Sequence, residues 1–113
     1  MPECLFCGII AGSLPSKKVF ENEEVVVIHD LHPKAPVHVL IIPKKHIVSA
    51  NDLSESDQNL AGKLLLAAKR VAGDLGVAQN GYKIIINTGK DGGQLIGHLH
   101  LHLLGGGMLT SVV

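Results

Sequence analysis

Residues 97–104 read Gly97-His98-Leu99-His100-Leu101-His102-Leu103-Leu104, and histidine alternates with leucine through most of this stretch. A period of two is typical of a β-strand with two distinct faces, because successive side chains point to opposite sides. We therefore expect a strand over residues 96–104, with its leucines in the core and with His98, His100 and His102 together on the other face. A single histidine is often an ordinary surface or core residue, but three on one strand face indicate a site.

Three histidines on one strand face have two chemical interpretations. The first is a metal site, although the outer pair would lie about 13 Å apart, at roughly 3.3 Å per residue, and would have to lean far inward to share one ion. The second interpretation divides the work, with one imidazole as nucleophile and another that moves or stabilises protons beside it. A neutral imidazole is suited to attack phosphorus near neutral pH. The spacing favours this second interpretation.

The rest of the chain predicts four more strands, one short helix and one long helix. The short helix is expected over residues 4–11, and the strands over residues 19–20, 25–29, 37–42 and 82–87. The long helix follows a capping-box pattern at Ser54 and Asp57, carries apolar residues at helical spacing over residues 60–75, and ends at Gly76. Strands followed by a packed helix indicate an α+β domain with a five-stranded antiparallel sheet.

The composition indicates one domain that includes residues 1–113, because a chain of this length has room for a single core. Ten basic and ten acidic residues balance, which gives no electrostatic signature of a nucleic acid polymer. No apolar run approaches the roughly 18–20 residues that span a bilayer. The start of the chain also lacks the features of a signal peptide, so we expect a cytoplasmic protein without a membrane partner.

Several motifs, taken together with the histidine stretch, resemble the histidine triad (HIT) family, and specifically its HINT branch of purine-nucleoside phosphoramidate hydrolases. In family order they are His29-Asp30, Ala35-Pro36-Val37-His38, Ile42-Pro43-Lys44-Lys45-His46, Asn87, Asp91-Gly92-Gly93-Gln94 and His98-Leu99-His100-Leu101-His102-Leu103. The resemblance covers residues 5–106 and implies a HIT-like α+β domain that dimerises into one continuous sheet. It also implies hydrolysis of an AMP-linked phosphoramidate or a related acyl-nucleotide through a covalent nucleotidyl-histidine intermediate.

The resemblance assigns roles to individual residues. His100 would be the nucleophile that attacks the α-phosphorus, and His102 and His38 would line the same phosphate site. An oxygen that gains charge in the transition state needs hydrogen-bond donors, for which the candidates are the Asn87 side chain and the Gly93 N–H. The carboxylate of Asp30 would accept hydrogen bonds from the ribose hydroxyls. An apolar slot would hold the purine base, and its residues would be Phe6, Ile9, Leu14, Ile28 and Leu31. Ordinary core positions are the alternative for these apolar residues.

A second site is implied around Cys4 and Cys7. Their close spacing alone suits a metal, a redox pair or two inert thiols. In some family members a zinc ion is held by such a pair, by the histidine of Pro-Lys-x-His and by the first histidine of the triad, which correspond here to His46 and His98. Two cysteines and two histidines form a closed structural zinc set. His98 would then be the first histidine of the catalytic triad motif, while its ring would face the zinc ion.

Two features depart from the HINT pattern. The C-terminus is short and reads Leu109-Thr110-Ser111-Val112-Val113, without the aromatic residue that some relatives extend toward the partner's active site. The residue two after Gly93 is commonly a small hydroxyl near the phosphate and the leaving group, and here it is Leu95. This change leaves two other classes of function open, a nucleotide-binding scaffold dimer with weak activity and a metal-dependent oxidoreductase that uses the histidine strand as ligands. His32 has no assigned chemistry and is expected to be solvated.

Overall fold

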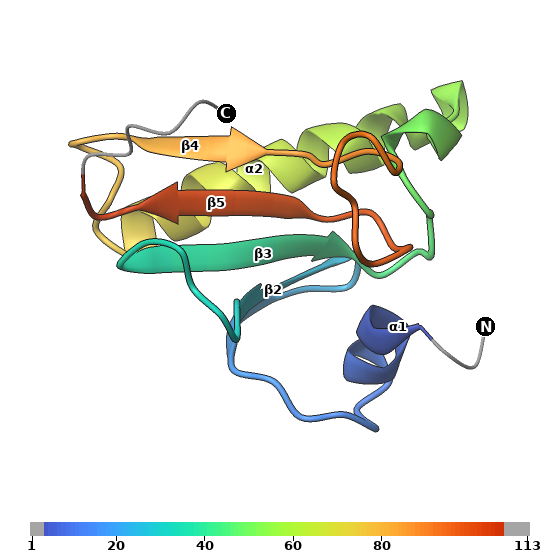
Figure 1. Ribbon diagram of the computed structural model, residues 1–113, viewed down its shortest axis with the longest axis horizontal. Helices are drawn as coiled ribbons and strands as arrows, with labels where there is room; N and C mark the ends of the chain where they lie inside the picture. The colour runs from blue at the N-terminus through green and yellow to red at the C-terminus, as the bar shows by residue number, and fades with distance from the viewer. Residues whose placement is uncertain (1–3, 108–113) are drawn as a thin grey trace.

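A computed structural model describes residues 4–107, which form an α+β fold around one antiparallel sheet of five strands in the order β1-β2-β3-β5-β4 (Figure 1). The strands are β1 (Lys18–Glu21), β2 (Val25–His29), β3 (Val37–Pro43), β4 (Tyr82–Ile85) and β5 (Leu101–Gly105). The helices are α1 (Leu5–Ile10), the short 3₁₀ helices η1 (Ala50–Asp52) and η2 (Glu55–Asp57), and the long α2 (Gln58–Asp74). The expected fold, with one short and one long helix, is confirmed.

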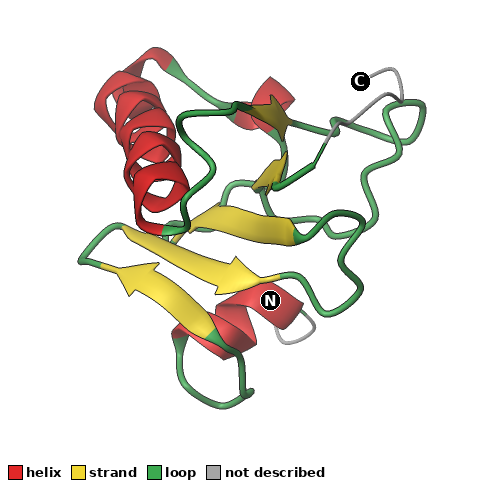
Figure 2. Cartoon of the chain, turned by 90° about the vertical axis from the view of Figure 1, so that its left-hand side faces the viewer, coloured by secondary structure: helices red, strands yellow, loops and turns green. Residues whose placement is uncertain are grey.

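The two α-helices cover opposite faces of the sheet (Figure 2). On β2, Val25 and Val27 belong to the buried cluster beneath α2, whereas Val26 and Ile28 belong to the smaller cluster beneath α1. Successive residues of a strand face opposite sides, so a strand that is covered on both faces is apolar along its length. The run of β-branched residues in β2 follows from this position in the sheet.

Polar contacts begin and end the α2 segment as the sequence predicts. The Ser54 N–H donates to Asp57 Oδ2 at 3.0 Å, which forms half of the expected capping box, although the first turn is the 3₁₀ helix η2. After the helix, Gly76 has a φ of 78°, and the Val77 N–H returns to the carbonyl of Ala72 at 3.0 Å. Within residues 4–107, no helix is both long enough and apolar enough to cross a membrane.

The pairing of β3 with β5 brings two histidines together. Leu40 lies opposite His102, and His38 lies opposite Leu104. Because positions two apart in a strand share a face, His38 and His102 both lie on the face that α1 covers in part. The leucines at 99, 101 and 103 are buried against α2 on the other face, as the alternation predicts.

The predicted boundaries of the last two strands are wrong. β5 begins at Leu101 rather than at residue 96, so His98 and His100 precede the ladder. The Leu99 N–H donates instead to the carbonyl of Ile47 at 2.6 Å, which ties this segment to the loop after β3. β4 correspondingly ends at Ile85 rather than at residue 87, because the chain opposite it leaves the ladder before Leu101.

Candidate functional site

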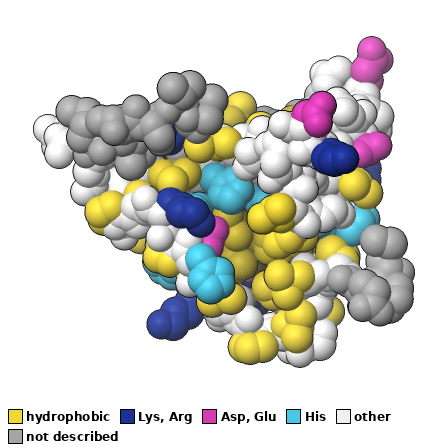
Figure 3. All heavy atoms as spheres, viewed as in Figure 1, with side chains coloured by type: hydrophobic (Ala, Val, Ile, Leu, Met, Phe, Trp, Pro, Cys, Tyr) yellow, Lys and Arg dark blue, Asp and Glu magenta, His cyan; other side chains and the backbone are white. Residues whose placement is uncertain are grey.

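A cavity of about 510 Å³ opens on the face of the sheet that carries the histidines. Figure 3 shows histidine and hydrophobic side chains gathered there beside charged side chains. The loop after β2, strands β3 to β5 and the loop before β5 all contribute to its walls. The lining residues are Asp30, His32, Lys34, His38, Leu40, Ile85, Asn87, Gly93, Gln94, Leu95, Ile96, His100, His102 and Leu104. Six of the expected phosphate-site and ribose-site residues therefore meet in one place.

His100 is buried with one ring nitrogen engaged by the backbone. Its Nδ1 lies 2.7 Å from the carbonyl oxygen of His98, and a carbonyl oxygen can only accept a hydrogen bond. His100 Nδ1 therefore carries the ring hydrogen of the neutral imidazole, and Nε2 has a free lone pair. This tautomer suits a nucleophile.

His38 and His102 form a second hydrogen-bonded unit beside His100. The Lys34 N–H donates to His38 Nδ1 at 3.0 Å, so the ring hydrogen of neutral His38 lies on Nε2. This Nε2 is 3.0 Å from His102 Nδ1 and 3.3 Å from Asp30 Oδ2. His102 Nδ1 consequently accepts, which places the His102 hydrogen on Nε2. The ring centroids of His100 and His102 are 5.0 Å apart, so a free lone pair and an N–H donor are neighbours.

The same hydrogen bonds argue against a metal ion held by the histidines that line the cavity. Asp30, His38 and His102 have ligand-type atoms within 4.8 Å of one another, a spacing that could suit an ion. The nitrogen that His38 offers is the protonated one, however, and a metal needs a free lone pair there. This geometry disfavours the oxidoreductase that uses the histidine strand as metal ligands.

Burial favours the uncharged form of His38, His100 and His102 near neutral pH. It lowers the pKa of His38 and of His100 below the ordinary value for histidine. For His102, burial and then the proximity of His100 and His38 lower the pKa to about 4. A neutral imidazole is the form that attacks an electrophile, so the environment favours a nucleophilic role.

The loop before β5 supplies the expected phosphate donors in a tight conformation. Gly93 has a φ of 78°, and a Cβ at Gly92 would lie only 2.3 Å from the carbonyl oxygen of Thr88. The Asn87 side chain lines the cavity and donates to the carbonyl of Gly92 at 2.8 Å. Gln94, to which the sequence assigned no role, holds this loop by donating to the carbonyl of Ile96 and by accepting from the N–H of Gly89. The position of Gln94 directly after two glycines was the sequence feature that could have indicated a role in holding the loop.

The apolar residues expected to hold the base do not come together at the cavity. Phe6, Ile9 and Ile28 are buried in the cluster beneath α1, and Leu31 is 84% exposed. Leu14 is 41% exposed. The Phe6 ring instead presents edge-on contacts to His98 and His100, at centroid distances of 5.8 and 5.1 Å.

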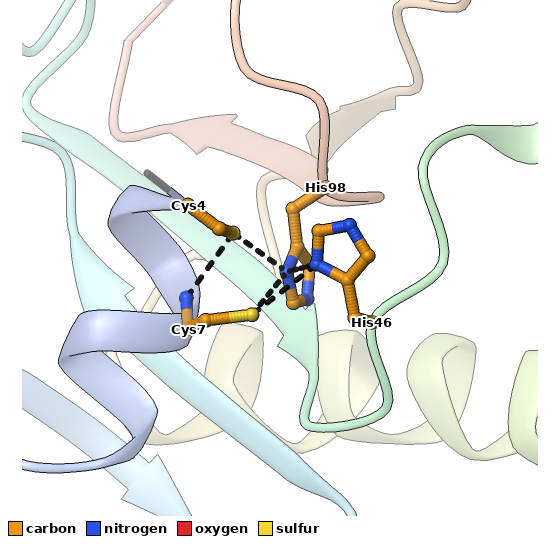
Figure 4. A group of neighbouring side chains, drawn as sticks. All are labelled: Cys4, Cys7, His46 and His98. Carbon is orange, nitrogen blue, oxygen red and sulfur yellow. Dashed lines mark hydrogen bonds between the residues drawn. The ribbon is translucent and has the colours of Figure 1, made fainter. Parts of the chain in front are cut away.

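The remaining histidine of the stretch faces a different group of side chains (Figure 4). His98 is fully buried, and its Nε2 hydrogen bonds to the carbonyl of Pro43 at 2.8 Å, which leaves Nδ1 free. His98 Nδ1 lies 3.3 Å from Cys4 Sγ, 3.7 Å from Cys7 Sγ and 3.1 Å from His46 Nδ1. His98 thus contributes its ring to this group and only its carbonyl oxygen to the His100 site.

The spacing within this group suits a tetrahedral ion. Zn–N bonds of about 2.0–2.1 Å and Zn–S bonds of about 2.3 Å place tetrahedral ligand atoms roughly 3.3–3.8 Å apart. The distances from His98 Nδ1 lie within a few tenths of an ångström of these values, and Cys7 Sγ is 3.2 Å from His46 Nδ1. The donor set therefore fits zinc.

Comparisons with known proteins connect this chain to one family. Residues 11–108 match the family model described as HIT domain. An uncharacterized HIT-like protein of Chlamydia muridarum is 49% identical over 111 residues, which cover 96% of this chain and 85% of that protein. The structure of a HIT family hydrolase from Legionella pneumophila Philadelphia 1 has a TM-score of 0.94 at 44% identity and 96% coverage of both chains. A Zn-bound histidine triad family protein from Mycobacterium smegmatis has a TM-score of 0.78 at 31% identity, with 92% of this chain and 75% of that chain covered.

Proposed function

This chain belongs to the HIT domain family, and we propose that it hydrolyses AMP-linked phosphoramidates or acyl-nucleotides, with His100 as the nucleophile. The observation that carries the proposal is the hydrogen bond from His100 Nδ1 to the carbonyl of His98, because it leaves Nε2 as the attacking atom. Two further features support it. The similar Legionella pneumophila protein is named a hydrolase, and the adjacent His102 presents an N–H donor.

The proposed reaction has two displacements at one phosphorus atom. His100 Nε2 forms a bond to the α-phosphorus while the bond to the leaving nitrogen or oxygen breaks, and the leaving group keeps that electron pair and takes up a proton. Water then attacks the phosphorus of the nucleotidyl-histidine, the phosphorus–nitrogen bond breaks, and AMP and a proton are released. The His102 N–H stabilises the charge that develops beside the nucleophile, and the Asn87 side chain and the Gly93 N–H stabilise the phosphate oxygens. Asp30 is assigned to the ribose hydroxyls.

Replacement of His100 tests this proposal directly. His100→Ala is expected to lower kcat by several orders of magnitude, because loss of a covalent nucleophile normally abolishes turnover. His29→Ala is the matched control, since His29 is an exposed histidine at the end of β2. Mass spectrometry of quenched wild-type reactions should find AMP on the peptide that contains His100. A His100→Ala variant that stays folded and keeps more than about a tenth of wild-type kcat would refute the assignment.

A scaffold protein with weak activity is the second candidate, and Leu95 favours it. This leucine is 95% exposed and lines the cavity where it offers neither a donor nor an acceptor. Tight AMP binding without significant turnover of any conjugate would identify the scaffold.

We further propose that Cys4, Cys7, His46 and His98 hold one structural zinc ion. Their interatomic distances support this, as does the name of the similar Zn-bound protein from Mycobacterium smegmatis. The ion would connect α1 to His46, in the loop after β3, and to His98, in the segment before β5. It would supply no step of the hydrolysis. A metal that binds only the folded chain raises its stability.

A homodimer and a cytoplasmic location are also proposed. β4 lies at one edge of the sheet, so the same strand of a second copy could extend it into a continuous sheet. A small single domain buries a modest core, which is a physical reason for association.

A further inference from the structure

The side chain of Gln94, in the loop before β5, spends both of its amide hydrogens on backbone carbonyls. Its Nε2 donates to the carbonyl of Val48 at 2.6 Å and to the carbonyl of Ile96 at 2.9 Å. Its Oε1 accepts from the Gly89 N–H at 2.9 Å. A side-chain amide carries only two hydrogens, so Gln94 has none to donate to a ligand from its side chain, although the residue lines the cavity.

A chain of hydrogen bonds continues from Gln94 to the proposed nucleophile. The Ile96 carbonyl that accepts from Gln94 Nε2 also accepts from the His98 N–H at 2.9 Å. The His98 carbonyl then accepts from His100 Nδ1 at 2.7 Å. The Gln94 amide and the His100 ring are therefore connected through the backbone of two residues, Ile96 and His98.

Gln94 also closes the turn that directs the Asn87 side chain. The Gln94 N–H donates to the Gly89 carbonyl at 3.0 Å, and the Gly89 N–H donates to Gln94 Oε1, so residues 89–94 form a closed turn. Within this turn, the Gly92 carbonyl accepts from Asn87 Nδ2 at 2.8 Å. An amide nitrogen has two hydrogens, so Asn87 can donate to Gly92 and to a phosphate oxygen at the same time. The turn thus orients a proposed phosphate donor.

The contact with Val48 anchors this arrangement to a second segment, the loop after β3. In the same loop, the carbonyl of Ile47 accepts from the Leu99 N–H at 2.6 Å. Two adjacent carbonyls of one loop therefore hold Gln94 and Leu99, the two ends of the stretch that leads to His100. Of these two anchors, the Gln94 contact is the one made by a side chain, so a substitution can remove it.

We propose that Gln94 is a positioning residue for the hydrolysis, which holds the Asn87 amide and the His100 ring in a fixed relation and donates no side-chain hydrogen bond to the substrate. This inference rests on the proposed function and adds a residue to the same site. A fixed nucleophile and fixed donors act on the transition state, and a misplacement of about 1 Å can cost about 10²-fold in rate. Loss of the Gln94 contacts should therefore lower kcat more than it raises KM.

Gln94→Glu tests the inference, because it keeps the size of the side chain and removes both donor hydrogens. At neutral pH the carboxylate would face the carbonyl oxygens of Val48 and Ile96, which repel it, while it could still accept from the Gly89 N–H. Gln94→Met removes the polar groups without adding a charge, and it carries the test if Gln94→Glu does not fold. Gln58→Glu is the matched control, since Gln58 is an exposed glutamine at the start of α2.

Each protein is assayed on one AMP aryl-phosphoramidate, and urea denaturation measures its stability. Gln94→Glu is expected to lower kcat by about 10- to 100-fold at neutral pH and to change KM by less than about threefold. Gln94→Met has the same direction, and Gln58→Glu changes neither constant. The ratio of kcat for Gln94→Glu to kcat for the wild type should rise as the pH falls from about 7 toward 5, because the protonated carboxyl group recovers one donor. Ionisations that both proteins share cancel in this ratio.

Several outcomes would overturn the inference while the hydrolase remains. Lower stability with kcat retained indicates a purely structural role, and a higher KM with kcat retained indicates direct contact with the substrate. A ratio that stays flat with pH means that the lost donors are not the cause. If the wild type turns over no conjugate, the proposed function fails, and NMR decides the positioning. Relative to Gln58→Glu, Gln94→Glu must then speed the exchange of the His98 N–H and the His100 Nδ1–H with solvent, and unchanged exchange overturns the inference.

Discussion

Phe6 is expected to support the histidines rather than to hold a base, and its replacement distinguishes these roles. The side chain is 1% exposed and belongs to the buried cluster beneath α1. Its ring edge contacts are to His98, whose ring faces the cysteines, and to His100, the proposed nucleophile. A residue in this position stabilises the fold and fixes the His100 ring, whereas a base-binding residue would mainly set the affinity for the nucleoside.

The magnitude follows from these contacts. Phe6→Leu keeps an apolar side chain but removes two edge-on ring contacts, each worth about 0.5–1.5 kcal/mol in aromatic pairs, so the expected loss of folding free energy is about 1–3 kcal/mol. Phe6→Ala would also leave a cavity and cost about 3–5 kcal/mol, which approaches the whole stability of a small domain. Phe6→Leu is therefore the informative variant.

Urea denaturation of protein with equal metal content measures the loss, and steady-state kinetics on adenosine and guanosine conjugates measures the site. Ile9→Val is the matched control, because Ile9 lies in the same cluster and on the same helix. We expect Ile9→Val to cost about 0.5–1.5 kcal/mol with kcat preserved. Phe6→Leu should lower kcat on both conjugates alike, with KM little changed. Unchanged stability together with a KM that rises for one base more than for the other would refute this reasoning and restore the base slot.

Four further predictions concern the metal, the histidines, Leu95 and the assembly. Elemental analysis of protein purified without chelators should find one zinc per chain, and protein refolded with zinc that still contains none would exclude the site. The folding free energy should fall as the pH drops from about 6.5 toward 4, because burial keeps the pKa of His102 at about 4 while the unfolded chain takes up a proton near the ordinary value; a flat profile in urea titrations would contradict this. Leu95→Ser should raise kcat on AMP-alkylamines more than on AMP-aryl conjugates, since general-acid help is worth about 10²–10⁴-fold for poor leaving groups, and an equal change on both means that Leu95 only packs the leaving group. Light scattering at micromolar concentration should give twice the chain mass, and a monomer mass would contradict the dimer.

The sequence predicts the sheet well because its signals are local. The alternation around His102 and the β-branched run of β2 report which faces are buried, and the helical spacing before Gly76 reports the face of α2. Strand ends are predicted less well. The ladder of β5 stops at Leu101 because Leu99 bonds to Ile47, a contact between residues far apart in the sequence.

The sequence predicts the chemical groups of the site but not all of the residues that line it. A histidine in an alternating pattern can be recognised as a candidate from its residue type. Phe6 cannot, because a core position and a base-binding position both require an apolar side chain. The places of His32 and Lys34 depend on a loop conformation that is set by the contact between the Lys34 N–H and His38. That contact involves a backbone group, and no residue type in the sequence reports it.

The spacing of the three histidines has a physical reason that involves the backbone as much as the rings. With Leu99 and Leu101 buried against α2, the side chains at 98, 100 and 102 are directed to the other face. The carbonyl of His98 then reaches His100 Nδ1, while the His98 ring reaches Cys4 and Cys7. Through its ring and its carbonyl, His98 therefore contacts the cysteine group and fixes the tautomer of His100, the proposed nucleophile.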